Sequence, residues 1–270
     1  MNPSQAIQVA REILEGDIAL HYFTDEHLNL MQRLEESLLS PKGEVILLQG
    51  SAGCGITTLL RKLETQHPTT TRMLKGDIYI GYWDFVNHLC DAFNVRRGDY
   101  QRNLIPAHLL RVLSLTKCKV LLIDDLDIYI ANENELDHVF STIRTLSEKM
   151  PAFTVVLSTR NEQLVNRFFK YAQPNWWSHS IRQRISIEEY YDLASRLWDG
   201  LNEMYSLDGL NEMYSLDVVT VNLESIEPRN GLDLQVANKA LRLHFVEQFL
   251  RQQGALGSLG DFNGLDEYDS

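Results

Sequence analysis

A glycine-rich stretch, GSAGCGITT at residues 50–58, has the residue types of a loop that binds phosphate. It follows the template G-x-x-x-x-G-K-[ST], with glycine at both template positions, Gly50 and Gly55, and a hydroxyl at Thr57. Glycine lets the chain wrap closely around an anion with its N–H groups inward, and the N-terminus of the following helix adds a favourable dipole. The candidate phosphate ligands are therefore the residues of this loop: Gly50, Ser51, Ala52, Gly53, Cys54, Gly55, Ile56, Thr57 and Thr58.

One position of the template is not met, because Ile56 stands where the motif has lysine. That lysine meets the β- and γ-phosphates both on binding and in the transition state. Losing a charge-assisted contact of about 1.5–3 kcal/mol lowers the affinity roughly ten- to a hundredfold, and we expect hydrolysis to suffer more. Lys62 lies one and a half helical turns further on and is expected to point away. The backbone N–H groups, the helix dipole and Mg²⁺ remain, so the sequence predicts weak binding of ATP or ADP.

Two acids follow a second apolar run, in the sequence VLLIDDLD at residues 120–127. A carboxylate at the end of a buried strand beside the loop can hold Mg²⁺ through water, and the next acid can orient an attacking water. The sequence therefore predicts that Asp124 and the hydroxyl of Thr57 hold Mg²⁺ and that Asp125 is a catalytic residue.

A third polar group, Ser158-Thr159-Arg160, follows the apolar run at 153–157. In sheets of this kind that strand lies between the two strands that carry the motifs, so a polar residue at its tip can sense the γ-phosphate. Arg160 is thus a second candidate catalytic residue, although a helix cap or a surface arginine fits these residues equally well. Three further arginines are candidates for an arginine finger acting on a neighbouring subunit, or else for ordinary ion pairs: Arg167, Arg182 and Arg184.

The elements that must position these residues alternate between strands and helices. Apolar runs predict strands at 44–49, 77–82, 119–124 and 153–157, and helical spacing of apolar residues predicts helices at 3–14, 25–40, 58–63, 83–93, 104–115 and 135–150. The strands are apolar throughout, which indicates a parallel sheet buried on both faces. Two later helices, at 188–198 and 232–253, complete an α/β fold with a three-layer α/β/α parallel sheet and a C-terminal helical lid.

These elements divide the chain into four segments. We expect N-terminal helices at 1–40, a nucleotide-binding core at 41–187, a helical lid at 188–253 and a flexible, acidic, glycine-rich tail at 254–270. The nonapeptide DGLNEMYSL at 199–207 recurs unchanged at 208–216. Nine residues are two and a half helical turns, so in one continuous helix the side chains of the second copy would point to the opposite face. We therefore expect one copy to form a loop or an extra turn.

Composition limits the partners and the compartment. The formal net charge of −12 disfavours DNA and anionic lipid as partners. The odd count of three cysteines, without a CxxC pair, indicates a reducing compartment. The N-terminus has charges within its apolar positions, unlike a signal peptide, and no apolar run reaches the about 18 residues of a membrane span. We therefore expect a cytoplasmic protein that does not contact a membrane.

Five segments together resemble the AAA+ ATPases of the ExeA-like secretion and transposition-activator group, which includes TniB- and MuB-like proteins. They are FTDEHLNLMQRL, GSAGCGITTLL as Walker A, VLLIDDLD as Walker B, VVLSTR and HSIRQRISIEEYYDLASRL, and the resemblance covers residues 20–198. It implies a P-loop NTPase fold of the AAA+ (ASCE) class, ATP or ADP with Mg²⁺ as cofactors, and a homo-oligomer or a related ATPase subunit as partner. Asp125 departs from the group, because most AAA+ ATPases have the longer glutamate there.

The function predicted from these observations is that of a pseudo-ATPase: an AAA+ nucleotide-binding protein with weak or absent hydrolysis that acts as an oligomerising regulatory or assembly subunit with a protein partner. Two alternatives remain open. STAND-type signalling NTPases are also similar in the Asp-Asp and Ser-Thr-Arg patterns, and a scaffold derived from a P-loop fold could bind a protein partner without enzymatic activity.

Overall fold

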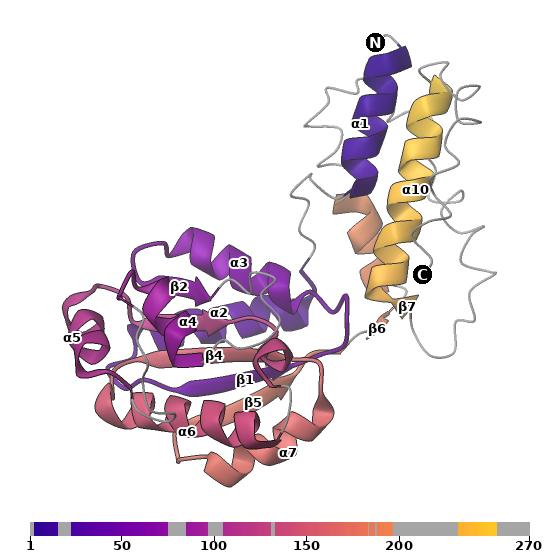
Figure 1. The fold of residues 1–270 in the computed structure, drawn as a ribbon. Helices are drawn as coiled ribbons and strands as arrows, with labels where there is room; N and C mark the ends of the chain where they lie inside the picture. Colours follow the sequence, from indigo (N-terminus) through magenta and orange to yellow (C-terminus); the bar gives the residue numbers. More distant parts are fainter. Residues whose placement is uncertain are drawn as a thin grey trace. The chain divides into compact units, whose positions relative to one another are not determined.

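The computed structural model describes residues 3–15, 23–74, 85–96, 105–130, 133–182, 184–186, 188–196 and 232–252. The chain forms two compact units (Figure 1). One is Phe23–Gln183, and the other combines Met1–Tyr22 with Arg184–Ser270. The helix predicted at 25–40 thus belongs with the sheet, whereas the division from sequence grouped it with the N-terminal helices.

The core of the larger unit is a parallel sheet with the strand order β2-β3-β4-β1-β5. Its strands are β1 (Val45–Gln49), β2 (Thr71–Leu74), β3 (Val120–Ile123), β4 (Thr154–Thr159) and β5 (Trp176–Ser180). As expected from the sequence, β4 lies between β1 and β3, the strands that precede the glycine-rich loop and the acids.

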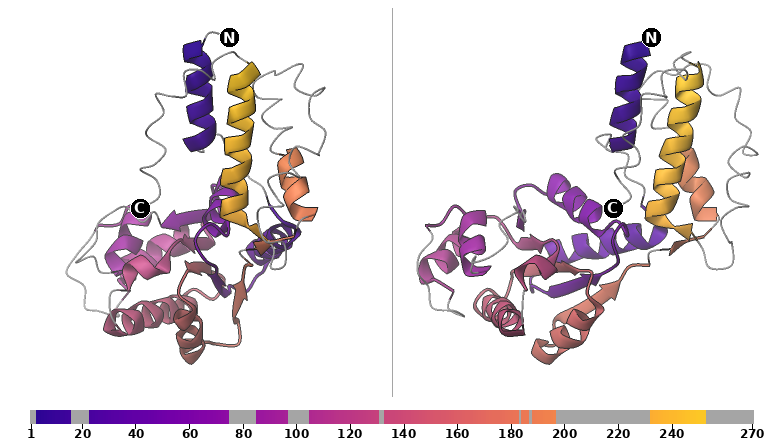
Figure 2. Two further views of the ribbon diagram at one scale, coloured as in Figure 1. Left: turned by 90° about the vertical axis from the view of Figure 1, so that its right-hand side faces the viewer. Right: turned by 45° about the vertical axis from the view of Figure 1, so that its right-hand side comes forward.

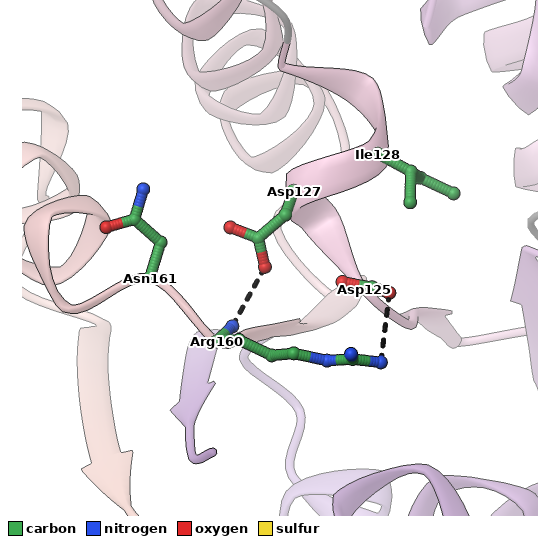
Figure 3. Close-up of a pocket in the computed structure, with 5 residues that line it drawn as sticks. All are labelled: Asp125, Asp127, Ile128, Arg160 and Asn161. Carbon is green, nitrogen blue, oxygen red and sulfur yellow. Dashed lines mark hydrogen bonds and ion pairs between the residues drawn. The ribbon is translucent and has the colours of Figure 1, made fainter. Parts of the chain in front are cut away.

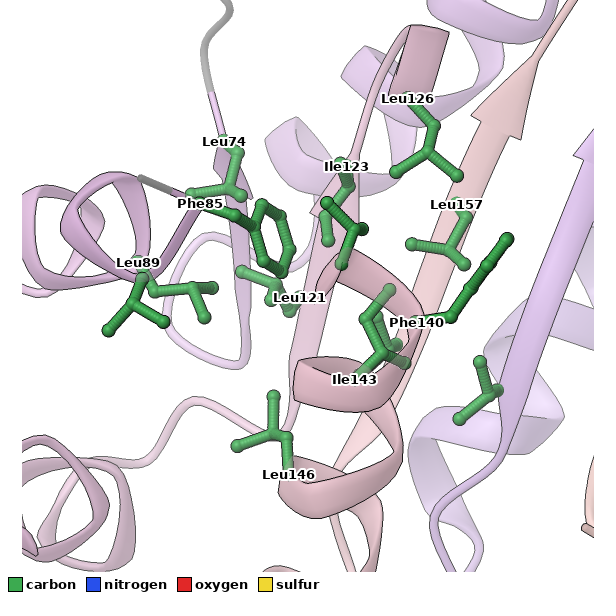
Figure 4. Packing of buried hydrophobic residues seen from close by; sticks show 14 of the residues in the cluster. Leu74, Phe85, Leu89, Leu121, Ile123, Leu126, Phe140, Ile143, Leu146 and Leu157 are labelled. Atoms are coloured by element: carbon green, nitrogen blue, oxygen red, sulfur yellow. The ribbon is translucent and has the colours of Figure 1, made fainter. Parts of the chain in front are cut away.

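Helices cover both faces of this sheet, and its side chains alternate between two apolar clusters. In β1, Val45 and Leu47 belong to one cluster and Ile46 and Leu48 to the other. The first cluster is completed by α4 (Phe85–Ala92), α5 (Ala107–Leu115), α6 (Glu133–Lys149) and α7 (Glu162–Tyr171), and Figure 4 shows part of it. The second is completed by α2 (Asp25–Leu39) and α3 (Ile56–Gln66). The expected three-layer α/β/α architecture is therefore confirmed.

The start of α2 shows how local sequence sets a helix boundary. The side chain of Thr24 caps the helix by accepting a hydrogen bond from the backbone N–H of His27 at 3.3 Å. Asp25 and Glu26 in the first turn carry negative charge at the positive end of the helix dipole. This cap fixes where α2 begins, close to the glycine-rich loop described below.

Several elements differ from the prediction. The strand predicted at 77–82, the repeat at 199–216 and the tail at 254–270 lie outside the described residues. The sequence analysis did not predict β2, β5 or α7. β2 is four residues long with an exposed charge at Arg72, and β5 (WWSHS) has three polar residues after its two tryptophans. The remaining predicted strands and helices of this unit are present, with ends shifted by up to three residues.

The smaller unit contains α1 (Pro3–Glu15), α10 (Leu234–Gln252), a helix at 188–196 and a short antiparallel pair, β6 (Arg184–Ile185) and β7 (Leu232–Asp233). The α1 and α10 helices lie side by side (Figures 1 and 2). Ile13 is buried, and its carbonyl accepts a hydrogen bond from the guanidinium of Arg242 at 2.7 Å. Within the described residues, no helix is long and apolar enough to cross a membrane.

Candidate functional site

The glycine-rich loop connects the end of β1 to the start of α3. Two of its glycines have positive φ, 79° at Gly53 and 91° at Gly55, which non-glycine residues adopt only at a cost. Gly55 is the N-cap of α3, and its carbonyl accepts the helical hydrogen bond from Leu59 at 2.9 Å. The N–H groups of the first turn of a helix have no acceptor within the helix. The loop therefore has the positive-φ glycines and the helix N-terminus that a phosphate-binding loop requires, and the Cys54 sulfur is hydrogen-bonded to the backbone of Ile56 at the start of the helix.

Ile56 lies in the apolar layer between the sheet and α3. Its side chain is 5% exposed and belongs to the cluster with Leu48, Leu59 and Leu60. Its Cδ1 would lie 3.0 Å from a Cβ added to Gly50, so it reaches back to the first residue of the loop. The position of the template lysine is thus occupied by a packed apolar group. Nor does Lys62 replace the cation, because its ammonium lies over the ring of Phe23, 4.4 Å from the centroid.

The acidic turn after β3 is held by Ser158 at the tip of β4. The hydroxyl of Ser158 donates to Asp124 Oδ1 at 2.7 Å and accepts from the N–H of Asp125 at 2.7 Å. Asp125 has a left-handed backbone, with φ 54° and ψ 62°, which is unfavourable for a residue with a side chain. Ser158 therefore stabilises both the orientation of the Asp124 carboxylate and the strained turn that follows it.

A second set of contacts joins Asp127 to Thr159, the last residue of β4, and to Arg160, which follows it. Asp127 accepts a hydrogen bond from the backbone N–H of Arg160 at 2.8 Å, which Figure 3 shows. It accepts another from the hydroxyl of Thr159 at 2.9 Å. The guanidinium of Arg160 lies 3.3 Å from Asp125. Asp125, Asp127, Arg160, Ile128 and Asn161 line an open pocket of about 420 Å³.

Burial changes the acidity of two groups at the site. Desolvation raises the pKa of Asp125, and the nearby Asp127 and Asp124 raise it further, while Arg160 opposes the shift. Burial also raises the pKa of the Cys54 thiol. Asp125 thus holds its proton more tightly than a free aspartate, which for a candidate base places its titration nearer neutral pH.

The structure places the glycine-rich loop and the acidic turn on either side of the end of β4. The N–H of Gly50 donates to the carbonyl of Thr159 at 3.1 Å, and Gln49 is paired with Thr159 in the sheet. The loop therefore flanks one side of the β4 tip, and the acidic turn flanks the other. Sequence reasoning missed the part played by Asp127, although this residue stands in the same VLLIDDLD segment.

The other candidate arginines, Arg167 and Arg182, make contacts with residues outside the candidate site. Arg182 pairs with Glu26 at 3.3 Å, and its backbone N–H donates to the same carboxylate. Arg167 lowers the pKa of Tyr171 through its charge, against a larger upward effect of Asp137. The side chain of Arg184 lies outside the described residues. For Arg182, the ion-pair alternative is the one that the structure contains.

The chain is similar to solved structures of two archaeal proteins. Cdc6p from Pyrobaculum aerophilum matches with a TM-score of 0.60 and 17% identity over 87% of this chain. A Walker-type ATPase of Pyrococcus abyssi matches with a TM-score of 0.54 and 11% identity, over 92% of this chain and 77% of that one. The fold is that of an AAA+ P-loop NTPase.

These likenesses concern the fold alone, because the identities are low. The chain spans 64% of the length of Cdc6p. No protein-family model and no curated protein matches the sequence.

Proposed function

We propose that this chain is an AAA+ nucleotide-binding protein that binds ATP or ADP weakly at the loop of residues 50–58 and hydrolyses ATP slowly or not at all. The observation that carries the proposal is Ile56. The loop around it has the backbone of a phosphate site, and the side chain in the lysine position is apolar and buried. Such a site keeps the helix dipole and part of its N–H donors, since the Cys54 sulfur is hydrogen-bonded to the backbone of Ile56, and it lacks the cation that stabilises the transferred phosphoryl group.

The residues present also fit Mg²⁺. Asp124 and the hydroxyl of Thr57 are the proposed ligands, since carboxylate and hydroxyl oxygens suit this ion. Ser158 occupies one oxygen of Asp124, and the second can take a metal-bound water. When bound, Mg²⁺ would neutralise charge on the β- and γ-phosphates.

Asp125 is proposed to orient the attacking water, and Arg160 to act at the γ-phosphate. Their ion pair at 3.3 Å supports a linked role, because either group would have to leave the other to reach substrate. Arg160 is 62% exposed, so its side chain can reorient at little cost.

We further propose that the protein acts as a regulatory or assembly subunit, with nucleotide bound between subunits of a homo-oligomer or beside a related ATPase subunit. The resemblance of the five sequence segments to the ExeA-like and TniB- or MuB-like group supports this role. Sedimentation velocity with and without Mg·ATP tests it, and a sedimentation coefficient that is the same in both conditions contradicts it.

The nucleotide site is tested by comparing the unmodified protein with Ile56→Lys and with Ile56→Met, an uncharged control of similar length. A fluorescent ATP analogue is titrated in the presence of Mg²⁺, and phosphate release is measured for each protein. We expect Ile56→Lys to bind ten- to a hundredfold more tightly, as a restored charge-assisted contact of about 1.5–3 kcal/mol requires. Ile56→Met should behave like the unmodified chain.

Three outcomes bear on the proposal. If neither the unmodified protein nor Ile56→Lys binds the analogue, nucleotide binding is refuted and a scaffold is favoured. Fast turnover by the unmodified chain would refute the weak-hydrolysis part. Hydrolysis restored in Ile56→Lys alone would support the proposal and show that the remaining residues of the site are competent.

A further inference from the structure

A buried histidine on α2 contacts the glycine-rich loop directly. His27 is 1% exposed, and its Nε2 lies 2.7 Å from the backbone carbonyl oxygen of Cys54. Its other ring nitrogen, Nδ1, lies 2.6 Å from the hydroxyl of Thr24, the residue that caps α2. The imidazole therefore connects a fixed helix end to the middle of the loop, across 27 residues of sequence.

The direction of the hydrogen bond to the loop follows from its partner. A carbonyl oxygen can only accept, so Nε2 of His27 carries the hydrogen and donates it to Cys54. In the neutral imidazole Nδ1 is then the acceptor, and the hydroxyl of Thr24 donates to it. The ring of Phe23 stands edge-to-face against the imidazole, with centroids 6.0 Å apart. Together these contacts fix the orientation of the ring.

Fixing the carbonyl of Cys54 also fixes the next N–H group. A trans peptide is planar, and its C=O and N–H point in opposite directions. Because the carbonyl of Cys54 points toward His27 on α2, the N–H of Gly55 points away from α2. We infer that His27 is a positioning residue of the phosphate loop, which holds the Cys54–Gly55 peptide so that its N–H is presented to the bound anion. This inference rests on the proposed nucleotide site.

The same contact gives a second reason for glycine at position 55. A Cβ placed there would lie 2.9 Å from Nε2 of His27, closer than a Cβ approaches a heavy atom outside its own chain neighbourhood. The positive φ of 91° already disfavours a side chain. His27 and Gly55 are therefore fitted to each other, since a larger residue at 55 would displace the imidazole from the loop.

The test replaces His27 in two ways. His27→Leu keeps an apolar side chain of similar bulk but has no donor, whereas His27→Gln places an amide N–H at about the same reach from the backbone. Ser37→Ala is the matched control, because Ser37 is also a buried polar residue of α2 but bonds to Arg33 and Glu44 instead of the loop.

The first measurement needs no nucleotide. Each protein is exposed to a small thiol reagent under native conditions, and labelling of each cysteine is followed by peptide mass spectrometry. Cys54 is 3% exposed and reports on the loop, while Cys90 and Cys118, also buried, report on opening of the whole unit. We expect His27→Leu to label Cys54 roughly two- to tenfold faster, with unchanged rates at Cys90 and Cys118, as the loss of one buried hydrogen bond predicts. His27→Gln should recover most of the difference.

The second measurement is the titration with the fluorescent ATP analogue and Mg²⁺, where His27→Leu should bind two- to tenfold more weakly and His27→Gln less so. The inference is overturned if Cys54 labels at the unmodified rate in His27→Leu, if all three cysteines accelerate together, or if Ser37→Ala has the same effect. Absence of nucleotide binding in the unmodified protein would refute the proposed function. The labelling result would still decide whether His27 holds the loop.

Discussion

Replacing Ser158 with alanine tests whether the tip of β4 holds the acidic turn. Ser158 is 4% exposed, and its hydroxyl makes two hydrogen bonds of 2.7 Å, one to the carboxylate of Asp124 and one from the N–H of Asp125. Ser158→Ala removes the donor to a charged group and leaves the N–H of a strained residue without this acceptor. The change in volume is one oxygen atom, so packing contributes little.

The magnitude follows from these two bonds. A hydrogen bond to a charged group contributes about 1.5–3 kcal/mol, and a neutral one contributes about 0.5–1.5 kcal/mol. The sum predicts that Ser158→Ala lowers the free energy of unfolding by roughly 2–4 kcal/mol, a large part of the about 5–15 kcal/mol of a typical domain. It should also weaken binding of the ATP analogue with Mg²⁺, because the Asp124 carboxylate loses its orientation.

Urea unfolding followed by tryptophan fluorescence measures the first effect. The control is Ser114→Ala. The hydroxyl of Ser114 donates to the carbonyl of Arg111 on the exposed face of α5, so its removal should change the free energy of unfolding by less than about 0.5 kcal/mol. A loss below about 1 kcal/mol for Ser158→Ala, with an unchanged denaturant slope, would contradict the reasoning. It would mean that water or a shift of the turn replaces both bonds.

Two further predictions concern stability. Thr142 on α6 is fully buried, and its hydroxyl has no hydrogen-bond partner among the described residues. Thr142→Val should therefore raise the free energy of unfolding by about 1 kcal/mol, measured by thermal or urea unfolding. A lower free energy of unfolding in this variant would show that the hydroxyl is bonded. The folded state raises the pKa of Asp125 above 3.8, so the folded protein binds this proton more tightly than the unfolded chain. As the pH rises from below 3.8 through the higher pKa of the folded state, Asp125 therefore contributes less to the free energy of unfolding. The stability of Asp125→Asn relative to the unmodified protein should accordingly be higher at pH 7 than at pH 3.5, and a difference independent of pH would contradict the shift.

The strands that carry the motifs could be predicted because they lie in the middle of the sheet. β1, β3 and β4 are buried on both faces, so their sequences are continuous apolar runs. β5 lies at the edge of the sheet, and its tryptophan Trp177 makes polar contacts that a hydropathy pattern cannot predict. The indole N–H of Trp177 donates to Glu44 at 2.7 Å, and the guanidinium of Arg33 stacks on its ring at 3.8 Å.

In the candidate site, too, some features could be predicted from the sequence and others could not. The loop, Asp124 and Asp125 could be proposed from the sequence because the chemistry expected of them depends on short spacing within one segment. The contacts that hold them could not, because they depend on strand pairing and on α2. Ser158 reaches Asp124 across 34 residues, and His27 reaches Cys54 across 27 residues. The sequence shows which groups could do chemistry, whereas the fold determines which groups hold them in place.

The burial of Ile56 has a consequence for how such a site can change over evolutionary time. An isoleucine side chain buried in the core stabilises the fold by about 1.5–3 kcal/mol, and Ile56 is 5% exposed. A mutation to lysine would give up part of that stability in the same step that returns a cation to the loop. A single change to lysine is therefore expected to restore the cation at the cost of part of the stability of the core.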